Sequence, residues 1–206
     1  LGPSGNRQSD FVTQISPGVS LSGPGGRVKA NANYSLQNLI YARDSSRNTL
    51  NHQFGGNANA ELAKDVLFFD ARASISQQNI SLLAPIGIDN TSATGNLGTF
   101  RTYSLGPRLV HKFGSFAQGE ARLSHEGTSS DVSGLNRSDA NRAALSLGSG
   151  PAFNDLSWGA NYSESRLEYS GRQDTRSSST SANLGYLLTP KFRVFANAGY
   201  EKNGDY

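Results

Sequence analysis

Apolar and polar residues alternate along most of this chain. The segment Arg27–Arg43 reads RVKANANYSLQNLIYAR, in which Val28 and Tyr34 share one face while Lys29 and Asn31 fall on the other. A period of two is typical of a β-strand, whose successive side chains point to opposite faces. The alternation runs for seventeen residues, whereas most strands have about five or six. The pattern therefore predicts unusually long strands.

The same alternation recurs in ten segments, and short connections between them alternate with longer polar loops. Hairpins repeated in this way predict an all-β fold, an antiparallel up-and-down meander of about ten strands. No change of composition divides the chain, so we expect a single domain over residues 1–206. The predicted strands are Phe11–Ser22, Arg27–Ala42, Leu50–Ala63, Leu67–Gln78, Thr99–Phe113, Ala117–Glu126, Asn141–Ser149, Leu156–Glu164, Ser177–Leu188 and Phe192–Glu201.

The two faces of these strands differ in chemistry. One register is apolar and rich in alanine, and we expect it to be uncharged; the opposite register is polar. Packed cores favour bulky side chains at high density, so the thin alanine-rich face suits contact with lipid better. A tilted strand crosses a bilayer with about 9–11 residues, which most segments supply. We therefore interpret the meander as part of a larger transmembrane β-barrel, with candidate lumen-lining charges at Lys29, Asp70, Arg72, Arg108, Lys112, Glu120, Arg122, Arg142, Arg193 and Glu201.

Aromatic residues of the apolar register gather near both ends of the predicted strands, as in the interfacial girdles of outer-membrane barrels. Pro17 and Pro107 fall inside strands, where each removes a backbone donor, and we expect β-bulges at both. The aromatic residues are Phe113, Phe153, Trp158, Tyr186 and Phe192 toward the short turns, and Phe11, Phe54, Tyr103, Tyr162 and Tyr200 toward the long loops.

Composition agrees with a sheet that lacks a thick core. Hydrophobic residues make up 35% of the chain and charged residues 17%, so the charge is too low for a charge-driven disordered chain. The net charge of +3 comes without a Lys/Arg cluster, which argues against a nucleic-acid partner. Cysteine is absent, which excludes disulfide frameworks and Cys-based zinc sites. No segment approaches the ~20 apolar residues of a membrane helix.

The turn pattern also orients the strands. Short turns of outer-membrane barrels face the periplasm and long loops face outside. The first connection, Gly23–Gly26, is short, so the first predicted strand begins outside, and the tenth ends there. We therefore expect strands to be missing at both ends, and a complete barrel of about twelve strands or more.

The sequence offers little for catalysis. His52, His111 and His125 all fall on the apolar register. Ser124 precedes His125 and therefore points to the opposite face, and Ser129 adds no triad geometry. We expect no enzymatic activity, no catalytic residues and no cofactor.

The loop between Gly127 and Ala140 contains two aspartates. Asp131 and Asp139 could bind calcium, but their spacing does not match an EF-hand loop. We therefore predict a solvated loop and no metal site.

The polar register holds one concentration of charge. A hairpin at Gly114 places Arg108 opposite Arg122 and diagonal to Glu120, with Lys112 nearby. Two interpretations stay open. Mixed charges can simply solvate and brace the wall, because lumen residues need only be polar. A basic stripe of Arg108, Lys112 and Arg122 would instead favour the passage of anions.

Two segments carry a family resemblance: RQSDFVTQISPGVSLSG, Arg7–Gly23, with SDFVTQISPGVSL as its most specific part, and ANYSLQNLIYARDSSRNTLNHQF, Ala32–Phe54. They resemble the PEP-CTERM/exosortase-system-associated outer-membrane protein family. The resemblance implies a Gram-negative outer-membrane β-barrel encoded beside exopolysaccharide and protein-sorting genes, and it supplies no catalytic residues. The implied partners are outer-membrane lipid and lipopolysaccharide, with acidic polysaccharide or export machinery as further candidates. The leading function is a porin-like or export-associated barrel; the alternative is a non-conducting barrel that anchors partners through its extracellular loops.

Overall fold

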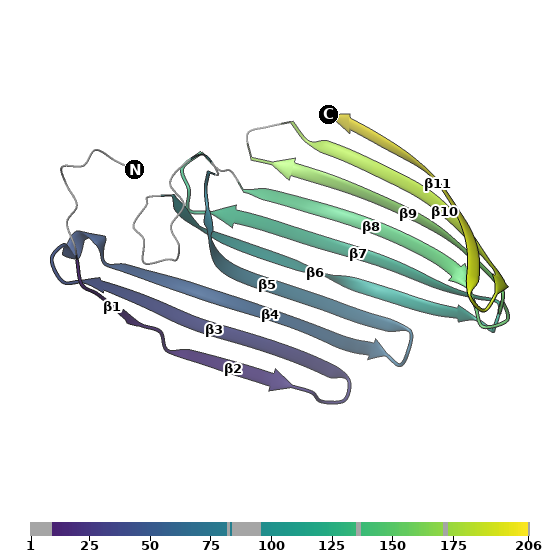
Figure 1. Cartoon of the computed structure of the whole chain (residues 1–206), viewed down its shortest axis with the longest axis horizontal. Coiled ribbons are helices and arrows are strands. Elements are labelled where there is room, and N and C mark those ends of the chain that lie inside the picture. The colour runs from purple at the N-terminus through teal and green to yellow at the C-terminus, as the bar shows by residue number, and fades with distance from the viewer. Residues whose placement is uncertain (1–9, 82, 84–95, 135–136, 171–172, 206) are drawn as a thin grey trace.

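The computed structural model describes residues 10–81, 83, 96–134, 137–170 and 173–205. They form one antiparallel sheet in which consecutive strands are neighbours, and β2 continues β1 along β3 (Figure 1). This confirms the all-β meander. A single 3-10 turn, Ser45–Arg47, joins β3 to β4. The strands are β1 Val12–Ile15, β2 Gly18–Gly23, β3 Val28–Tyr41, β4 Thr49–Ala63, β5 Leu67–Asn79, β6 Leu97–Phe113, β7 Ala117–Ser130, β8 Ser138–Ser149, β9 Leu156–Tyr169, β10 Thr175–Thr189 and β11 Phe192–Asp205.

The sheet is open within the described residues, because its two edges, β1–β2 and β11, do not pair with each other. Much of the predicted long loop between residues 79 and 98 lies outside the described residues, as do residues 135–136 and 171–172 of the next two loops. No helix in the described part of the chain is long and apolar enough to cross a membrane.

The first predicted strand is divided in two at Pro17. The pairing with β3 keeps one register across the break, with Ile15 opposite Asn38 and Gly18 opposite Ser35. The prediction of a β-bulge at Pro17 is therefore wrong. Pro17 lies on an edge strand, where a missing backbone donor disrupts only one ladder.

Pro107 also interrupts pairing without a bulge. Leu105 pairs with His125 and Arg108 with Arg122, so the ladder between β6 and β7 resumes in the same register after the gap. Alternate residues of an antiparallel strand bond to the same neighbour. The Thr99 carbonyl, eight residues before Pro107, accepts a hydrogen bond from the β7 side. The missing N–H of Pro107 therefore faces β7, which explains the gap. The register shifts that do occur lie beside short turns, at Glu61/Ala63 and Leu187/Thr189.

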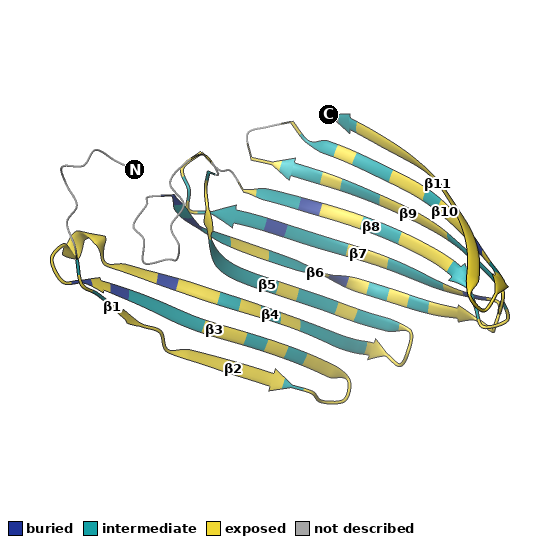
Figure 2. Ribbon diagram, viewed as in Figure 1, coloured by how far each residue is buried: buried dark blue, intermediate teal, exposed yellow. Residues whose placement is uncertain are grey.

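The outward face is apolar and uncovered. Pairing aligns Leu109, Ala121, Leu145 and Tyr162 in one row across four strands. Leu145 is 54% exposed and Leu123, on the same face, 58%. No second layer packs on the described sheet, and its strands alternate between exposed and half-buried residues (Figure 2). The buried hydrophobic residues of the described part are Leu39, Tyr41, Ala117 and Ala140.

The outward register is not uncharged along its whole length. Arg101 and Glu164 lie on it within the predicted strands, because Arg101 pairs with Ile75 and Glu164 with Ala143. Arg166 follows on the same face, since β9 continues to Tyr169. The expectation of an uncharged register therefore fails near the long loops and holds toward the short turns.

An aromatic cluster joins two of the short turns. The rings of Phe116 and Phe153 lie 5.2 Å apart, and that of Trp158 lies 5.8 Å from Phe116. The Gly150 amide donates to the Phe116 carbonyl at 2.7 Å. The β8–β9 turn is thereby fixed against the β6–β7 turn, and aromatic residues do gather at this end of the sheet.

Candidate functional site

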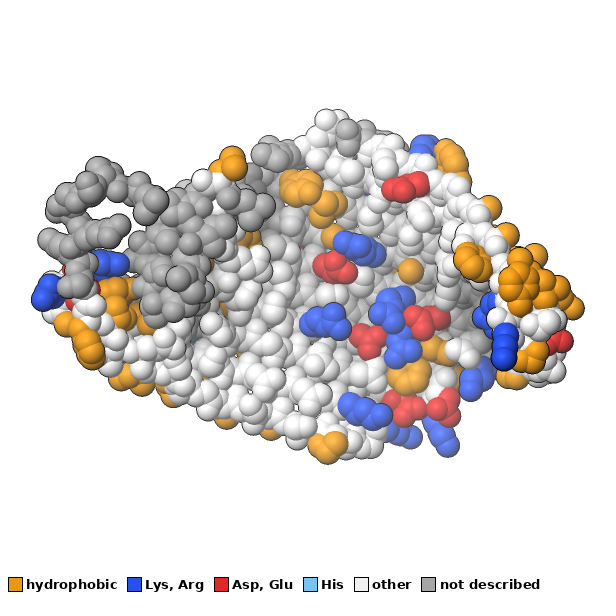
Figure 3. All heavy atoms as spheres, viewed as in Figure 1, with side chains coloured by type: hydrophobic (Ala, Val, Ile, Leu, Met, Phe, Trp, Pro, Cys, Tyr) orange, Lys and Arg blue, Asp and Glu red, His pale blue; other side chains and the backbone are white. Residues whose placement is uncertain are grey.

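The polar face carries a cluster of charges over β5–β8. Figure 3 shows blue and red side chains gathered there among small polar ones. Cross-strand pairing decides which of them meet. One row runs Asn57, Arg72, Ser104 and Glu126, and these side chains share the polar face.

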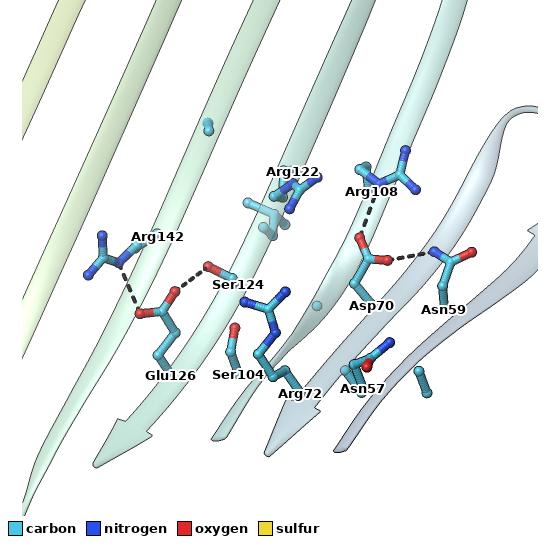
Figure 4. Close-up of a pocket in the computed structure, with 15 residues that line it drawn as sticks. Asn57, Asn59, Asp70, Arg72, Ser104, Arg108, Arg122, Ser124, Glu126 and Arg142 are labelled. Carbon is cyan, nitrogen blue, oxygen red and sulfur yellow. Dashed lines mark hydrogen bonds and ion pairs between the residues drawn. The ribbon is translucent and has the colours of Figure 1, made fainter. Parts of the chain in front are cut away.

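A hollow of about 510 Å³ opens at the centre of this cluster, over Gly106. Gly106 lacks a side chain and its neighbours Ser104 and Ser124 are small, so the longer arginines around them leave space. Figure 4 shows these side chains around the hollow. It is lined by Asn57, Ala58, Asn59, Asp70, Ala71, Arg72, Ser104, Gly106, Arg108, Arg122, Leu123, Ser124, Glu126, Arg142 and Ala144.

Ion pairs bind the cluster together. Arg108 Nε lies 3.0 Å from Asp70 Oδ2 and its Nη1 lies 3.7 Å from Glu120 Oε2. Arg122 Nη2 lies 3.2 Å from Glu120 Oε1. Asn59 donates to the other oxygen of Asp70 at 2.6 Å. The network therefore spans β4 to β7, and it holds the two arginines with two carboxylates.

A second pair closes the other side of the hollow. Arg142 Nε lies 3.3 Å from Glu126 Oε2, and the Ser124 hydroxyl donates to Glu126 Oε1 at 3.4 Å. The Arg108 guanidinium stacks over the Phe68 ring, 4.4 Å from its centroid.

The predicted position of Arg108 opposite Arg122 and diagonal to Glu120 is confirmed. The pair is not a basic stripe, however, because Asp70 and Glu120 balance both charges. Lys112 pairs with Gln118 nearer the short turn and does not line the hollow. This balance fits the first of the two interpretations, in which mixed charges brace the wall; Asp70 reaches Arg108 from β5, the strand that precedes β6.

Besides Lys112, three of the predicted residues lie elsewhere on the polar face. Lys29 pairs with Asn59 from β3, while Arg193 and Glu201 belong to the edge strand β11. The structure does not bring them into the cluster. Conversely, Glu126 was absent from the predicted set although the alternation alone places it on the polar register. The uncharged lining residues Asn57, Asn59, Ser104 and Ser124 carried no distinguishing signal in the sequence.

The outward histidines are engaged with polar neighbours. His125 Nε2 lies 3.1 Å from Tyr103 Oη, and its Nδ1 lies 2.9 Å from Asn141 Oδ1. His52 Nδ1 lies 2.8 Å from Tyr34 Oη. No serine hydroxyl bonds to a histidine in the described part of the chain, so a Ser–His pair is not formed there.

The two loop aspartates have separate structural partners. Asp131 accepts the Thr99 amide at 2.8 Å, and this backbone hydrogen bond lowers the pKa of the Asp131 carboxyl below its ordinary value. Asp139 pairs with Arg137 at 2.8 Å. No group of three or more potential metal ligands occurs among the described residues.

The described sheet is a single antiparallel layer with one exposed apolar face and one polar face. This arrangement is typical of the wall of a transmembrane β-barrel. Neither a family model nor a curated protein matches the chain. Among solved structures it is similar to OmpTdeltaL8, a loop L8 deletion mutant of OmpT, an outer membrane protein of Vibrio cholerae. The TM-score is 0.53 at 10% identity, over 85% of this chain and 58% of that chain. The chain thus has the fold of an outer-membrane β-barrel and spans less than two thirds of that relative.

Proposed function

We propose that this chain forms the wall of a porin-like β-barrel in the Gram-negative outer membrane, with the polar face lining a water-filled lumen. The observation that carries the proposal is the uncovered apolar face. Soluble proteins rarely expose contiguous apolar patches of this extent. In lipid, the same face needs no covering layer, and hydrogen-bonded strands satisfy the backbone.

Strand length supports the same placement. The strands from β3 onward have 12 to 17 residues, more than the about 9–11 that a tilted crossing needs. The excess lies toward the long loops, where Arg101, Glu164 and Arg166 stand on the outward face. Charges are tolerated near an interface and costly at the midplane. Arg101 is suited to contact lipid headgroups and lipopolysaccharide, whereas Arg166 is paired with Glu168 and Asp174.

The resemblance of Arg7–Gly23 and Ala32–Phe54 to the PEP-CTERM/exosortase-associated family adds a context to the proposal. It connects the barrel with exopolysaccharide export or the biofilm matrix. Acidic polysaccharide and export machinery are the partners that this context supplies.

A non-conducting barrel that anchors partners through its long loops is the second candidate. The ion-pair network of Asp70, Arg108, Glu120 and Arg122 favours it, because paired charges brace a wall without selecting a solute.

Single-channel recording in planar bilayers separates the two candidates. We expect discrete conductance steps. Replacing Ser104, beside the hollow, with Trp should reduce the step size, whereas Leu105→Trp, on the outward register, should leave it unchanged. A protein that inserts and folds without conducting would contradict the pore and favour the anchor.

A further inference from the structure

We propose that the hollow over Gly106 binds an acidic sugar, a hexose unit that carries one carboxylate, with Arg72 as the residue that recognises the negative charge. This inference rests on the proposed function, because it requires the polar face to meet water. It goes further by assigning a ligand class and the residues that hold it.

The first observation is a row of unpartnered polar side chains. Asn57, Arg72 and Ser104 stand opposite one another on β4, β5 and β6. None of the three side chains forms a hydrogen bond or ion pair with another described residue, and Figure 4 shows them side by side without a dashed line. Asn57 and Arg72 are exposed. The row therefore presents amide, guanidinium and hydroxyl donors to whatever enters the hollow.

The second observation is the charge balance. Arg108, Arg122 and Arg142 each have a carboxylate within 4 Å, from Asp70, Glu120 or Glu126. Arg72 is the cation of the hollow that lacks one among the described residues. A guanidinium offers a planar fork that matches a carboxylate. The site thus has capacity for one added negative charge.

The same carboxylates set the limit on that charge. Asp70 and Glu126 line the hollow together with Arg72, and they would repel a ligand with several negative groups. The remaining lining amides and hydroxyls, from Asn57, Ser104 and their neighbours, suit sugar hydroxyls. A volume of about 510 Å³ falls within the range of about 300–1,000 Å³ typical of small-ligand sites. A monoanionic sugar fits these features better than a polyphosphate.

Calorimetric titration of the protein, folded in detergent micelles, tests the assignment. The probes are sodium glucuronate, glucose 6-phosphate and glucose. We expect saturable glucuronate binding that Arg72→Gln weakens about tenfold or more, the loss expected for a hydrogen bond to a charged group. Arg72→Lys should weaken it less. Arg193→Gln, which removes a charge from the same face on β11, should leave the affinity unchanged. Glucose should bind more weakly than glucuronate.

Three results would overturn the inference. They are an unchanged affinity in Arg72→Gln, an equal loss in Arg193→Gln, and tighter binding of glucose 6-phosphate than of glucuronate. Circular dichroism of each variant establishes that the sheet is intact before titration. If conductance steps persist but glucuronate does not bind, the sugar site is contradicted and the pore proposal stands. If glucuronate binds but the protein does not conduct, the pore is contradicted and the sugar site stands.

Discussion

Gly106 connects the hollow on the polar face with the irregular pairing of β6. A Cβ added at this position would overlap the Leu123 carbonyl oxygen of β7. The next residue, Pro107, has no N–H to donate across the same seam. The two residues together bring the backbones close where the ladder is interrupted, and they leave space above for a ligand.

Gly106→Ala should therefore destabilise the sheet although alanine is small. We expect a loss of about 1–3 kcal/mol, the usual cost of overpacking, because backbone rather than a movable side chain occupies the space. Gly55→Ala on β4 is the matched control, since nothing lies within 4 Å of an added Cβ there. Urea titration of both variants in micelles measures the difference, and equal midpoints would show that the seam is not tight.

The two faces of β8 provide a second prediction at this scale. Leu145→Arg places a charge on the outward face and should cost about 2–4 kcal/mol at the bilayer midplane. The adjacent Ser146→Arg points to the polar face and should be mild. Ala71→Arg and Ser74→Arg form the same comparison on β5. Folding into lipid vesicles, followed by gel mobility, measures the yield; equal yields would contradict the lipid-facing assignment.

At the scale of elements, the β6–β7 hairpin is fastened at both ends. Phe113 pairs with Ala117 at the short turn. At the other end the Asp131 carboxylate accepts the Thr99 amide at 2.8 Å, and the Asp131 amide donates to the Thr99 carbonyl at 3.3 Å. The contact between the Asp131 carboxylate and the Thr99 amide depends on pH, because the carboxylate titrates.

The Thr99 backbone hydrogen bond lowers the pKa of Asp131 in the folded protein. The stabilisation is therefore fully present above the ordinary aspartate pKa and is lost as the pH falls through the lowered value. We expect the amide resonance of Thr99 to titrate in acid below the ordinary aspartate range. The Asp131→Asn variant should show no such titration. A Thr99 amide that is insensitive to pH in the wild-type chain would contradict the contact.

Strand positions and facing were predictable from the sequence because alternation is a local signal. Tyr34 of β3 and Phe54 of β4, for example, were both placed on the apolar register by the alternation, and they stand opposite each other in the sheet. The ion pair between Arg108 and Asp70 was harder to predict, because a long loop connects β5 to β6 and the alternation does not fix the register of these two strands. The break at Pro17 and the gap at Pro107 depended on which neighbour each backbone group faced, which the alternation does not reveal.

At the scale of the whole molecule, the described chain is one curved layer with β1 and β2 at one edge of the sheet and β11 at the other (Figure 1). In water the apolar face would contribute nothing to its stability, because no second layer covers that face in the described chain. In a bilayer that face contacts acyl chains, while the charged hollow faces the opposite side. The central claim is therefore the assignment of the two faces to lipid and to water.

The absence of cysteine makes this claim directly measurable by spin labelling. Single cysteines at residues 143–147 of β8, each carrying a nitroxide, should alternate in their collision rates in lipid vesicles. Labels at 143, 145 and 147 should collide preferentially with oxygen dissolved in lipid, and those at 144 and 146 with a water-soluble nickel chelate. Accessibility to nickel at all five positions, or alternation in the opposite phase, would contradict the account.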